Sequence, residues 1–215
     1  MGQDTAPPEF SDRFRDQFDQ LMRWRRDVRR FRPDPVPAET CRRLAGLAAL
    51  APSVGLSQPW RFVSVESDAA RAKMRDNFET ENARALAGYD GERAQLYAGL
   101  KLSGLDDAPV HWAVFCDEAT DSGSGLGART MPEMRRYSVV AAITQIWLAA
   151  RAEGLGIGWV SILDPDRVVR DLGVDPDWRL VAYLCVGYPA EDSTEPELAR
   201  AGWETRSAEI VMDVR

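Results

Sequence analysis

The sequence predicts an α+β fold, and two observations carry this prediction. Helical and extended segments do not alternate regularly, because two helical segments precede the first strand and long helices separate later strands. In addition, Gly154, Gly156 and Gly158 follow a helix and enter a strand, whereas a dinucleotide-binding glycine motif leads from a strand into a helix. We therefore expect one sheet flanked by helices rather than a doubly wound parallel sheet.

Length and composition favour a single domain spanning residues 1–215. With 45% hydrophobic and 28% charged residues, the chain is long enough to bury a substantial core. Residues 1–12 are polar and contain prolines, so we expect a flexible arm. Residues 189–215 are too polar to form a core of their own, and we expect them to pack on a partner subunit.

Charge and cysteine content exclude several classes of protein. A net charge of −7 argues against nucleic-acid binding. The odd number of cysteines and their wide spacing favour neither a disulfide framework nor a zinc site. His111 is the single histidine, so we expect no His-based metal site and interpret His111 as a structural residue near a strand start. With no apolar run of ~20 residues and no signal segment, we expect a cytoplasmic protein without a membrane span.

Four segments account for the first part of the chain. Residues 11–30 are expected to form a helix, because apolar side chains recur there at helical spacing. Residues 37–48 predict a second helix that begins with a proline in its first turn. A loop over residues 53–60 then leads into a strand over residues 61–65, which has β-branched and aromatic residues.

The middle of the chain contains the longest helices. Residues 68–97 are charged and rich in alanine, which predicts a helical region with a break at the glycines of residues 88–91. The apolar run 110–115 predicts a central strand, and residues 117–129 predict a flexible loop or lid. Residues 133–153 predict a long helix with a wide apolar face.

The last elements follow a glycine-rich turn. Residues 154–158 are expected to cap the long helix and turn into a third strand over residues 159–163. A short helix is expected over residues 166–172. A fourth strand is expected over residues 180–188, followed by the polar tail.

A dense cationic cluster precedes Phe31. Arg25, Arg26 and Arg29 flank one carboxylate, Asp27. Arginine presents paired N–H donors in a plane, which suits a phosphate, and such a cluster in an acidic chain indicates an anionic ligand. The lone Asp27 would repel that ligand, so it indicates another task, such as orienting an arginine or handling a proton. The alternative is that the cluster is only the charged end of an amphipathic helix.

Three groups of residues together resemble the flavin-dependent nitroreductase superfamily, over residues 20–206. They are Arg25-Arg26-Asp27-Val28-Arg29, then Ala51-Pro52-Ser53 with Ser57-Gln58-Pro59-Trp60-Arg61-Phe62, and then Gly154-Leu155-Gly156 with Gly158-Trp159. The resemblance implies a nitroreductase-like fold with a central mixed sheet flanked by helices. It also implies a homodimer that binds FMN at the subunit interface.

The resemblance assigns roles to particular residues. Arg25, Arg29 and Arg206 would bind the FMN phosphate, and Ser53 would lie beside the flavin. Lys101 would reach the flavin or, alternatively, lie at a solvated helix end. The other residues that the resemblance places around FMN are Arg26, Asp27, Val28, Gly158 and Ser161.

Within the superfamily, Arg-Arg-Asp-Val-Arg together with Gly-Trp-Val-Ser is similar to the branch that consumes its own flavin. This branch converts reduced FMN and O2 into 5,6-dimethylbenzimidazole, the lower ligand of cobalamin, and releases erythrose 4-phosphate. A separate flavin reductase would supply reduced FMN, and no metal takes part. The aspartate and the serine needed for cleavage fall on Asp27 and Ser161.

The chemistry explains these residue types. Protons must move on and off the flavin ring and the ribityl carbon, and Asp27, kept ionised by its arginine neighbours unless burial prevails, would accept a proton or orient a group. Ser161 offers one donor and two lone pairs but has no histidine to activate it as a nucleophile. Alternatively, Ser161 is a strand serine bonded to the backbone.

Two other functions remain open at this point. One is an ordinary FMN oxidoreductase that uses NAD(P)H to reduce nitroaromatics or quinones, and the other is a non-catalytic flavin carrier. Both predict that bound FMN survives turnover or storage. The fate of the flavin therefore distinguishes them from the flavin-consuming enzyme.

Overall fold

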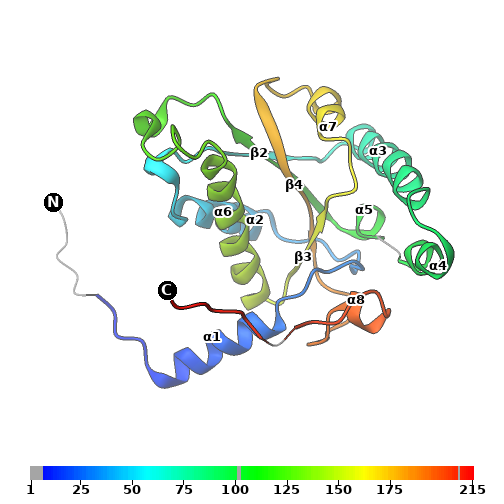
Figure 1. Ribbon diagram of the computed structural model, residues 1–215, viewed down its shortest axis with the longest axis horizontal. Coiled ribbons are helices and arrows are strands. Elements are labelled where there is room, and N and C mark those ends of the chain that lie inside the picture. Colours follow the sequence, from blue (N-terminus) through cyan, green and yellow to red (C-terminus); the bar gives the residue numbers. More distant parts are fainter. Residues whose placement is uncertain (1–6, 101–102, 208) are drawn as a thin grey trace.

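The computed structural model describes residues 7–100, 103–207 and 209–215, and it confirms the α+β class (Figure 1). A four-stranded sheet with the order β1-β2-β4-β3 forms its centre. The strands are β1 Trp60–Ser64, β2 Val110–Asp117, β3 Gly156–Val160 and β4 Trp178–Gly187. The helices are α1 Asp12–Trp24, α2 Ala38–Leu47, α3 Asp68–Leu86, α4 Gly91–Gly99, α5 Gly104–Asp107, α6 Met134–Ala152, α7 Pro165–Leu172 and α8 Glu197–Arg200. Three 3-10 turns are η1 Ala48–Leu50, η2 Val54–Leu56 and η3 Ser122–Gly125.

The strand expected to be central, β2, does lie inside the sheet, where it pairs with both β1 and β4. All three strand pairs are antiparallel, whereas we expected a mixed sheet. Among the described residues, the parallel pairing consists of one bridge between Asp27 and Ile157. This bridge lies on β3, which is an edge strand. The open edge of β3 is therefore available to the segment that contains Asp27.

Helices cover both faces of the sheet (Figure 1). On one face α6 buries Val139, Ile143 and Ile146 completely, as its wide apolar stripe predicts. On the other face Met74 of α3 and Val168 of α7 enter a second cluster of buried side chains. No helix in the described ranges is long and apolar enough to cross a membrane.

Several sequence predictions agree with the structure within a few residues. The long helix, the short helix before the last strand and the break between α3 and α4 all lie where the pattern predicts them. His111 lies near the start of β2, is 1% exposed, and places its Nδ1 2.8 Å from the Tyr183 hydroxyl. This buried position agrees with the structural role expected for His111.

The first helix is shorter than predicted. It ends at Trp24 instead of Arg30, and Arg25 already has an extended backbone with φ −66° and ψ 123°. The prediction is wrong because the residues after Trp24 pair with the edge of β3 and place Phe31 in the core, where it is 5% exposed. Tertiary pairing thus outweighs local helix propensity, and the cationic cluster is not the end of a helix.

The third strand begins earlier than predicted, at Gly156 instead of Trp159, and it ends at Val160 instead of Leu163. Gly154 has φ +76° and follows the end of α6, which fits a capping role. Gly156 and Gly158 are strand residues, although glycine is depleted from strands in general. Ser161 consequently lies directly beyond β3 rather than within it.

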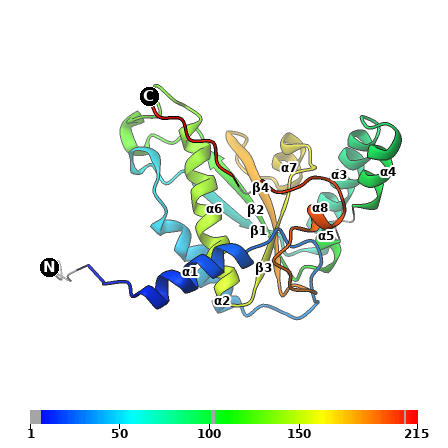
Figure 2. The ribbon, with the colours of Figure 1, turned by 60° about the horizontal axis from the view of Figure 1, so that its bottom comes forward.

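The C-terminal segment is anchored within its own chain up to Trp203. The Trp203 ring packs against Tyr89 and Tyr97, with ring centroids 5.6 and 6.2 Å away, and the Arg93 guanidinium lies 4.5 Å from its centroid. Beyond this anchor the chain continues as an extended segment (Figure 2). Trp203 therefore has packing partners within its own chain, and packing of residues 189–215 on a partner subunit stays a prediction.

Candidate active site

Residues 25–29 lie along the open edge of β3. The Val28 N–H donates to the Ile157 carbonyl at 3.0 Å, which continues the sheet by one short parallel pairing. A Cβ on Gly158 would lie 2.1 Å from the Val28 carbonyl oxygen, and one on Gly156 would lie 2.5 Å from a Val28 methyl group. Gly158 thus allows this close approach, and its role here is to position the segment.

Asp27 is held at a defined place by this pairing. Its Oδ1 accepts a hydrogen bond from the Trp159 N–H at 2.9 Å, and its Oδ2 lies 3.7 Å from Arg29 Nε. Partial withdrawal from water raises the pKa of Asp27, against the opposing effects of the Trp159 N–H, Arg29 and Arg25. Burial thus prevails over the arginines in setting the direction of this pKa shift, which is the alternative that the sequence analysis left open, and the raised pKa makes Asp27 a stronger base.

A cleft of about 280 Å³ brings the cationic cluster together with the C-terminal segment. Its lining includes Arg25, Arg26, Asp27, Arg29 and Arg206, which the sequence analysis had assigned to one ligand. Partial burial lowers the pKa of Arg26, and the charges of Arg25 and Arg206 lower it further. Such crowding of like charges favours an anionic ligand in this cleft.

Arg29 adds an observation that fits an anion. Its side chain is only 11% exposed, and its buried Nη1 has no hydrogen-bond partner among the described residues. An unpaired buried guanidinium nitrogen is costly unless a ligand accepts its hydrogen bond. The Ser103 hydroxyl donates to the Arg29 carbonyl at 3.2 Å and so fixes the backbone. Lys101, expected either near the flavin or at a solvated helix end, lies outside the described residues.

Arg206 reaches the cleft because Trp203 is anchored. The Trp203 N–H donates to the Leu198 carbonyl at 2.9 Å, and the Trp203 carbonyl accepts from Arg93 at 2.6 Å. These contacts fix the backbone three residues before Arg206. The polar tail therefore contributes a cation to the site of its own chain.

Trp147 is a site residue that the sequence analysis missed. Its indole N–H donates to the Arg26 carbonyl at 3.1 Å, and the Arg25 guanidinium lies 5.0 Å from its ring centroid. The ring of Trp159 lies 6.3 Å from that of Trp147. Its position in the apolar stripe of α6 indicated only a core residue, so no signal in the sequence distinguished it.

Two predicted site residues, Ser161 and Ser53, are not among the described residues that line the cleft. Ser161 is exposed and lies two residues after Trp159, roughly 7 Å further along the chain than the N–H that holds Asp27. Ser53 lies in the turn before β1, where its hydroxyl accepts from the Gln58 N–H at 3.1 Å.

The nitroreductase family model matches residues 22–188, which cover the cationic segment and the whole sheet. The chain belongs to the nitroreductase family. Among curated proteins, it is 58% identical over 199 residues to the 5,6-dimethylbenzimidazole synthase of Rhodospirillum rubrum, covering 93% of this chain and 94% of that protein. It is 47% identical to the 5,6-dimethylbenzimidazole synthase of Rhodobacter capsulatus, covering 91% of this chain and 94% of that protein.

Solved structures agree with the fold. The oxidised iodotyrosine deiodinase bound to FMN and 3-iodo-L-tyrosine matches with a TM-score of 0.75 at 24% identity, covering 92% of this chain and 99% of that one. A BluB-like flavoprotein from Clostridium difficile 630 matches with a TM-score of 0.65 at 22% identity, covering 83% and 92%. At these identities the likeness shows a shared fold.

Proposed function

We propose that this chain is a 5,6-dimethylbenzimidazole synthase, which converts reduced FMN and O2 into 5,6-dimethylbenzimidazole with release of erythrose 4-phosphate. The observation that carries the proposal is the 58% identity to a synthase of the same name over nearly the full length of both chains. The cleft supports it, because it places a carboxylate of raised pKa beside unpaired arginines.

In the proposed enzyme the arginines bind the phosphate of FMN. Arg29 would donate from its buried Nη1, while Arg25 and Arg206 would approach from the other sides of the cleft. Arg26, Val28 and the backbone at Gly158 would complete the wall. Paired N–H donors on several arginines suit a phosphate dianion and fix the direction in which the ligand enters.

Asp27 and Ser161 would act at the flavin end of the site. Bound FMN supplies the electrons for O2 and the carbon and nitrogen atoms of the product. Asp27, held by the Trp159 N–H, would accept a proton through the carboxylate oxygen that faces Arg29. Ser161 is exposed beside this position, so its hydroxyl is available to hydrogen-bond a ligand atom.

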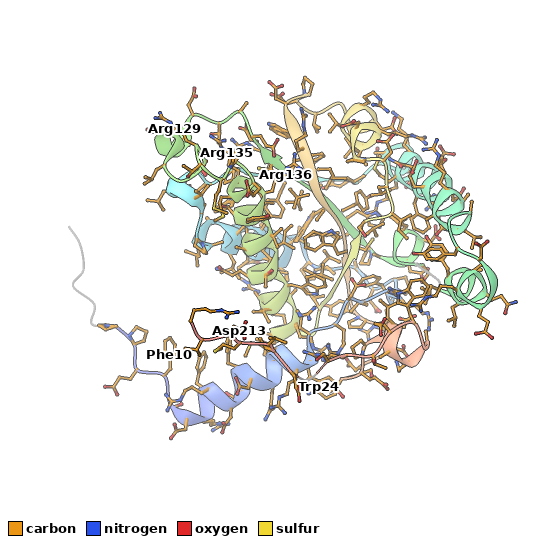
Figure 3. The ribbon with its side chains drawn as sticks, viewed as in Figure 1. Phe10, Trp24, Arg129, Arg135, Arg136 and Asp213 are labelled. Carbon is orange, nitrogen blue, oxygen red and sulfur yellow. The ribbon has the colours of Figure 1, made fainter. Side chains whose placement is uncertain are left out.

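We further propose a homodimer with FMN at the subunit interface. Apolar side chains on and before α1 are exposed, with Phe10 at 55% and Phe14 at 45%. Phe10 lies just before the start of α1 (Figure 3). In the C-terminal segment Ile210 and Val211 are 90% and 92% exposed. Such contiguous apolar exposure favours burial against a second copy. Ser53, which does not line the cleft of its own chain, would then approach the flavin from the second copy. Light scattering that gives a monomer in the presence of FMN would contradict this part.

Two further parts of the proposal concern the cell. Reduced FMN would come from a separate flavin reductase, because the role assigned to the cleft is binding of the flavin rather than of a nicotinamide. A cytoplasmic location fits the three cysteines, which are unpaired in the described structure and of which Cys116 and Cys185 are buried.

The experiment that tests the function follows the fate of the flavin. The protein is loaded with FMN, reduced by light without oxygen and then exposed to air, and the products are separated by chromatography. We expect 5,6-dimethylbenzimidazole to appear as FMN disappears. Recovery of intact FMN, together with NADH-dependent reduction of a nitroaromatic, would instead support an ordinary oxidoreductase; one relative, 32% identical over 177 residues, is an NADH dehydrogenase of Thermus thermophilus.

A further inference from the structure

Trp147 of α6 contacts the cationic segment, which also pairs with β3. The Arg26 carbonyl accepts from Trp147 Nε1 at 3.1 Å, while Asp27 accepts from the Trp159 N–H at 2.9 Å. The backbone between α1 and Phe31 is thus held from α6 and from β3. Trp147 itself is not among the described residues that line the 280 Å³ cleft.

The geometry points to Trp147 as the positioning residue that sets the direction of both Arg25 and Asp27. This inference rests on the proposed function and extends it to a residue outside the ligand cleft. The Arg26 carbonyl and the Asp27 N–H belong to one planar peptide group, so a hydrogen bond to the carbonyl also fixes the plane from which the Asp27 side chain departs.

The same indole also holds the Arg25 side chain in place. Its guanidinium lies 5.0 Å from the Trp147 ring centroid, within the range of a cation–π contact. Arg25 has no ion pair with any described carboxylate, and it is the residue that follows α1. The ring therefore provides a fixed surface for a side chain that would otherwise sample many rotamers, and it leaves the guanidinium N–H groups available to a ligand.

The core packing of Trp147 does not require these two contacts. Trp159 and Trp147 are both partly buried against the same core cluster, and the cluster contacts neither depend on the indole N–H nor need a cation above the ring. A phenylalanine at position 147 keeps most of the apolar contact and removes the donor. The Trp147→Phe variant therefore separates positioning from packing.

Trp178 offers a matched control. It is also partly buried against a core cluster and also has an arginine near its ring, with Arg61 5.9 Å from the centroid. It lies at the far end of β4 from Val186, the partner of Ile157, which is roughly 27 Å along the strand. The Trp178→Phe variant loses the same atoms without touching residues 25–29.

The first test measures the affinities of oxidised FMN and of riboflavin, which lacks the phosphate, for the parent, Trp147→Phe and Trp178→Phe. We expect Trp147→Phe to lower the ratio of FMN to riboflavin affinity about two- to ten-fold, the worth of a hydrogen bond in the site. Trp178→Phe is expected to leave the ratio unchanged. A general loss of stability would weaken the binding of FMN and of riboflavin equally. If Trp147→Phe lowered both affinities by the same factor, the proposal would be overturned.

The second test asks whether Asp27 is displaced. After photoreduction and admission of air, the share of flavin that becomes 5,6-dimethylbenzimidazole is compared with the share recovered as FMN. We expect the product share to fall on the order of ten-fold or more in Trp147→Phe, because small misplacements of a reacting group cost that much. A product share equal to that of the parent would show that Trp147 does not position Asp27. If the parent itself returns all its FMN, the proposed function fails, and the affinity ratio alone decides the role of Trp147.

Discussion

The arginines of this chain fall into two groups that differ in how their charge is balanced. Many of those away from the cleft are paired with carboxylates: Arg61 lies 2.7 Å from Asp117, and Arg151 lies 2.7 Å from Asp192. Such pairs lie at or near the surface, where each contributes little to stability. They leave no net positive charge in their surroundings.

In the cleft the balance is reversed. Arg25, Arg26 and Arg206 form no ion pair with a carboxylate of the described chain, and Arg29 approaches Asp27 only to 3.7 Å. In a chain with a net charge of −7, concentrated unpaired cations create a local positive field that the composition as a whole does not show. The local arrangement of charges, rather than their sum over the chain, therefore indicates an anionic ligand.

The largest expected effect comes from Asp27, the carboxylate that lies 3.7 Å from Arg29 in the cleft. We expect Asp27→Asn to lower the rate of 5,6-dimethylbenzimidazole formation about 10²–10⁴-fold, because a positioned proton acceptor is lost. The amide oxygen can still accept from the Trp159 N–H, and a negative charge beside Arg29 disappears, so FMN affinity should be retained or increased. Initial rates of product formation at saturating reduced FMN measure the loss. If the variant formed product at the parental rate, Asp27 would have no catalytic role.

The second effect compares one arginine from each group. Arg29→Ala should weaken FMN binding roughly ten- to hundred-fold, since a charge-assisted hydrogen bond contributes about 1.5–3 kcal/mol. Arg167→Ala removes an arginine that is 3.2 Å from Asp171 and should leave FMN affinity unchanged. Fluorescence titration measures both constants. If the two variants bound FMN with equal affinity, Arg29 would not be a phosphate ligand.

A third variant moves the cationic segment without altering any charge. Gly158→Ala would place a Cβ 2.1 Å from the Val28 carbonyl, so the segment must shift away from β3. We expect a loss of about 1–3 kcal/mol in the free energy of unfolding, as in other overpacked sites, together with weaker FMN binding. Gly46→Ala in α2 meets no atom within 4 Å and should be neutral or stabilising by up to about 1 kcal/mol. Denaturant unfolding of both variants checks this, and parental stability of Gly158→Ala would contradict the proposed close approach.

The Ser161 hydroxyl should have a smaller effect. We expect Ser161→Ala to lower product formation about two- to ten-fold, the worth of one hydrogen bond, with more of the flavin recovered as FMN. Chromatography of the flavin and the product after a single exposure to air measures both quantities. Unchanged rate and recovery would leave Ser161 as a surface residue without a role.

The smallest effect concerns stability and pH in the absence of ligand. The folded state raises the pKa of Asp27, so protonation of Asp27 favours folding, and this stabilisation is lost as pH rises from the ordinary carboxyl range through the folded pKa. Asp27→Asn cannot ionise, so its Tm should exceed that of the parent at pH 7, and the difference should shrink near pH 3.5. Calorimetry measures the Tm of both proteins as a function of pH. A Tm difference that grew on acidification would contradict a raised pKa of Asp27.

The sequence predicts those elements whose stability is local or whose pattern is long. The apolar stripe of α6 is a periodic signal, the glycines between α3 and α4 are a local helix-breaking signal, and both predictions are confirmed. The apolar run of β2 likewise indicates a covered strand. In each case the pattern extends over most of the element.

The parts that were not predicted depend on contacts between distant segments. Arginine, aspartate and valine after Trp24 do not forbid a helix, and the hydrogen bond from Val28 to Ile157, which ends it, joins residues over a hundred positions apart. The strand character of Gly158 follows from the same contact. Trp147 could not be separated from other apolar residues of its helix, because its indole partner is the Arg26 carbonyl. The position of Arg206 came from the family resemblance alone.

A crystal structure with bound FMN tests the central claim most directly. We expect the phosphate oxygens within about 2.7–3.2 Å of Arg29 Nη1, with Arg25 and Arg206 as further donors and the flavin ring toward Asp27. Three arginines outside the cleft, Arg129, Arg135 and Arg136, lie near the start of α6, far from Trp24 (Figure 3). A phosphate bound there, or anywhere outside the 280 Å³ cleft, would contradict the account.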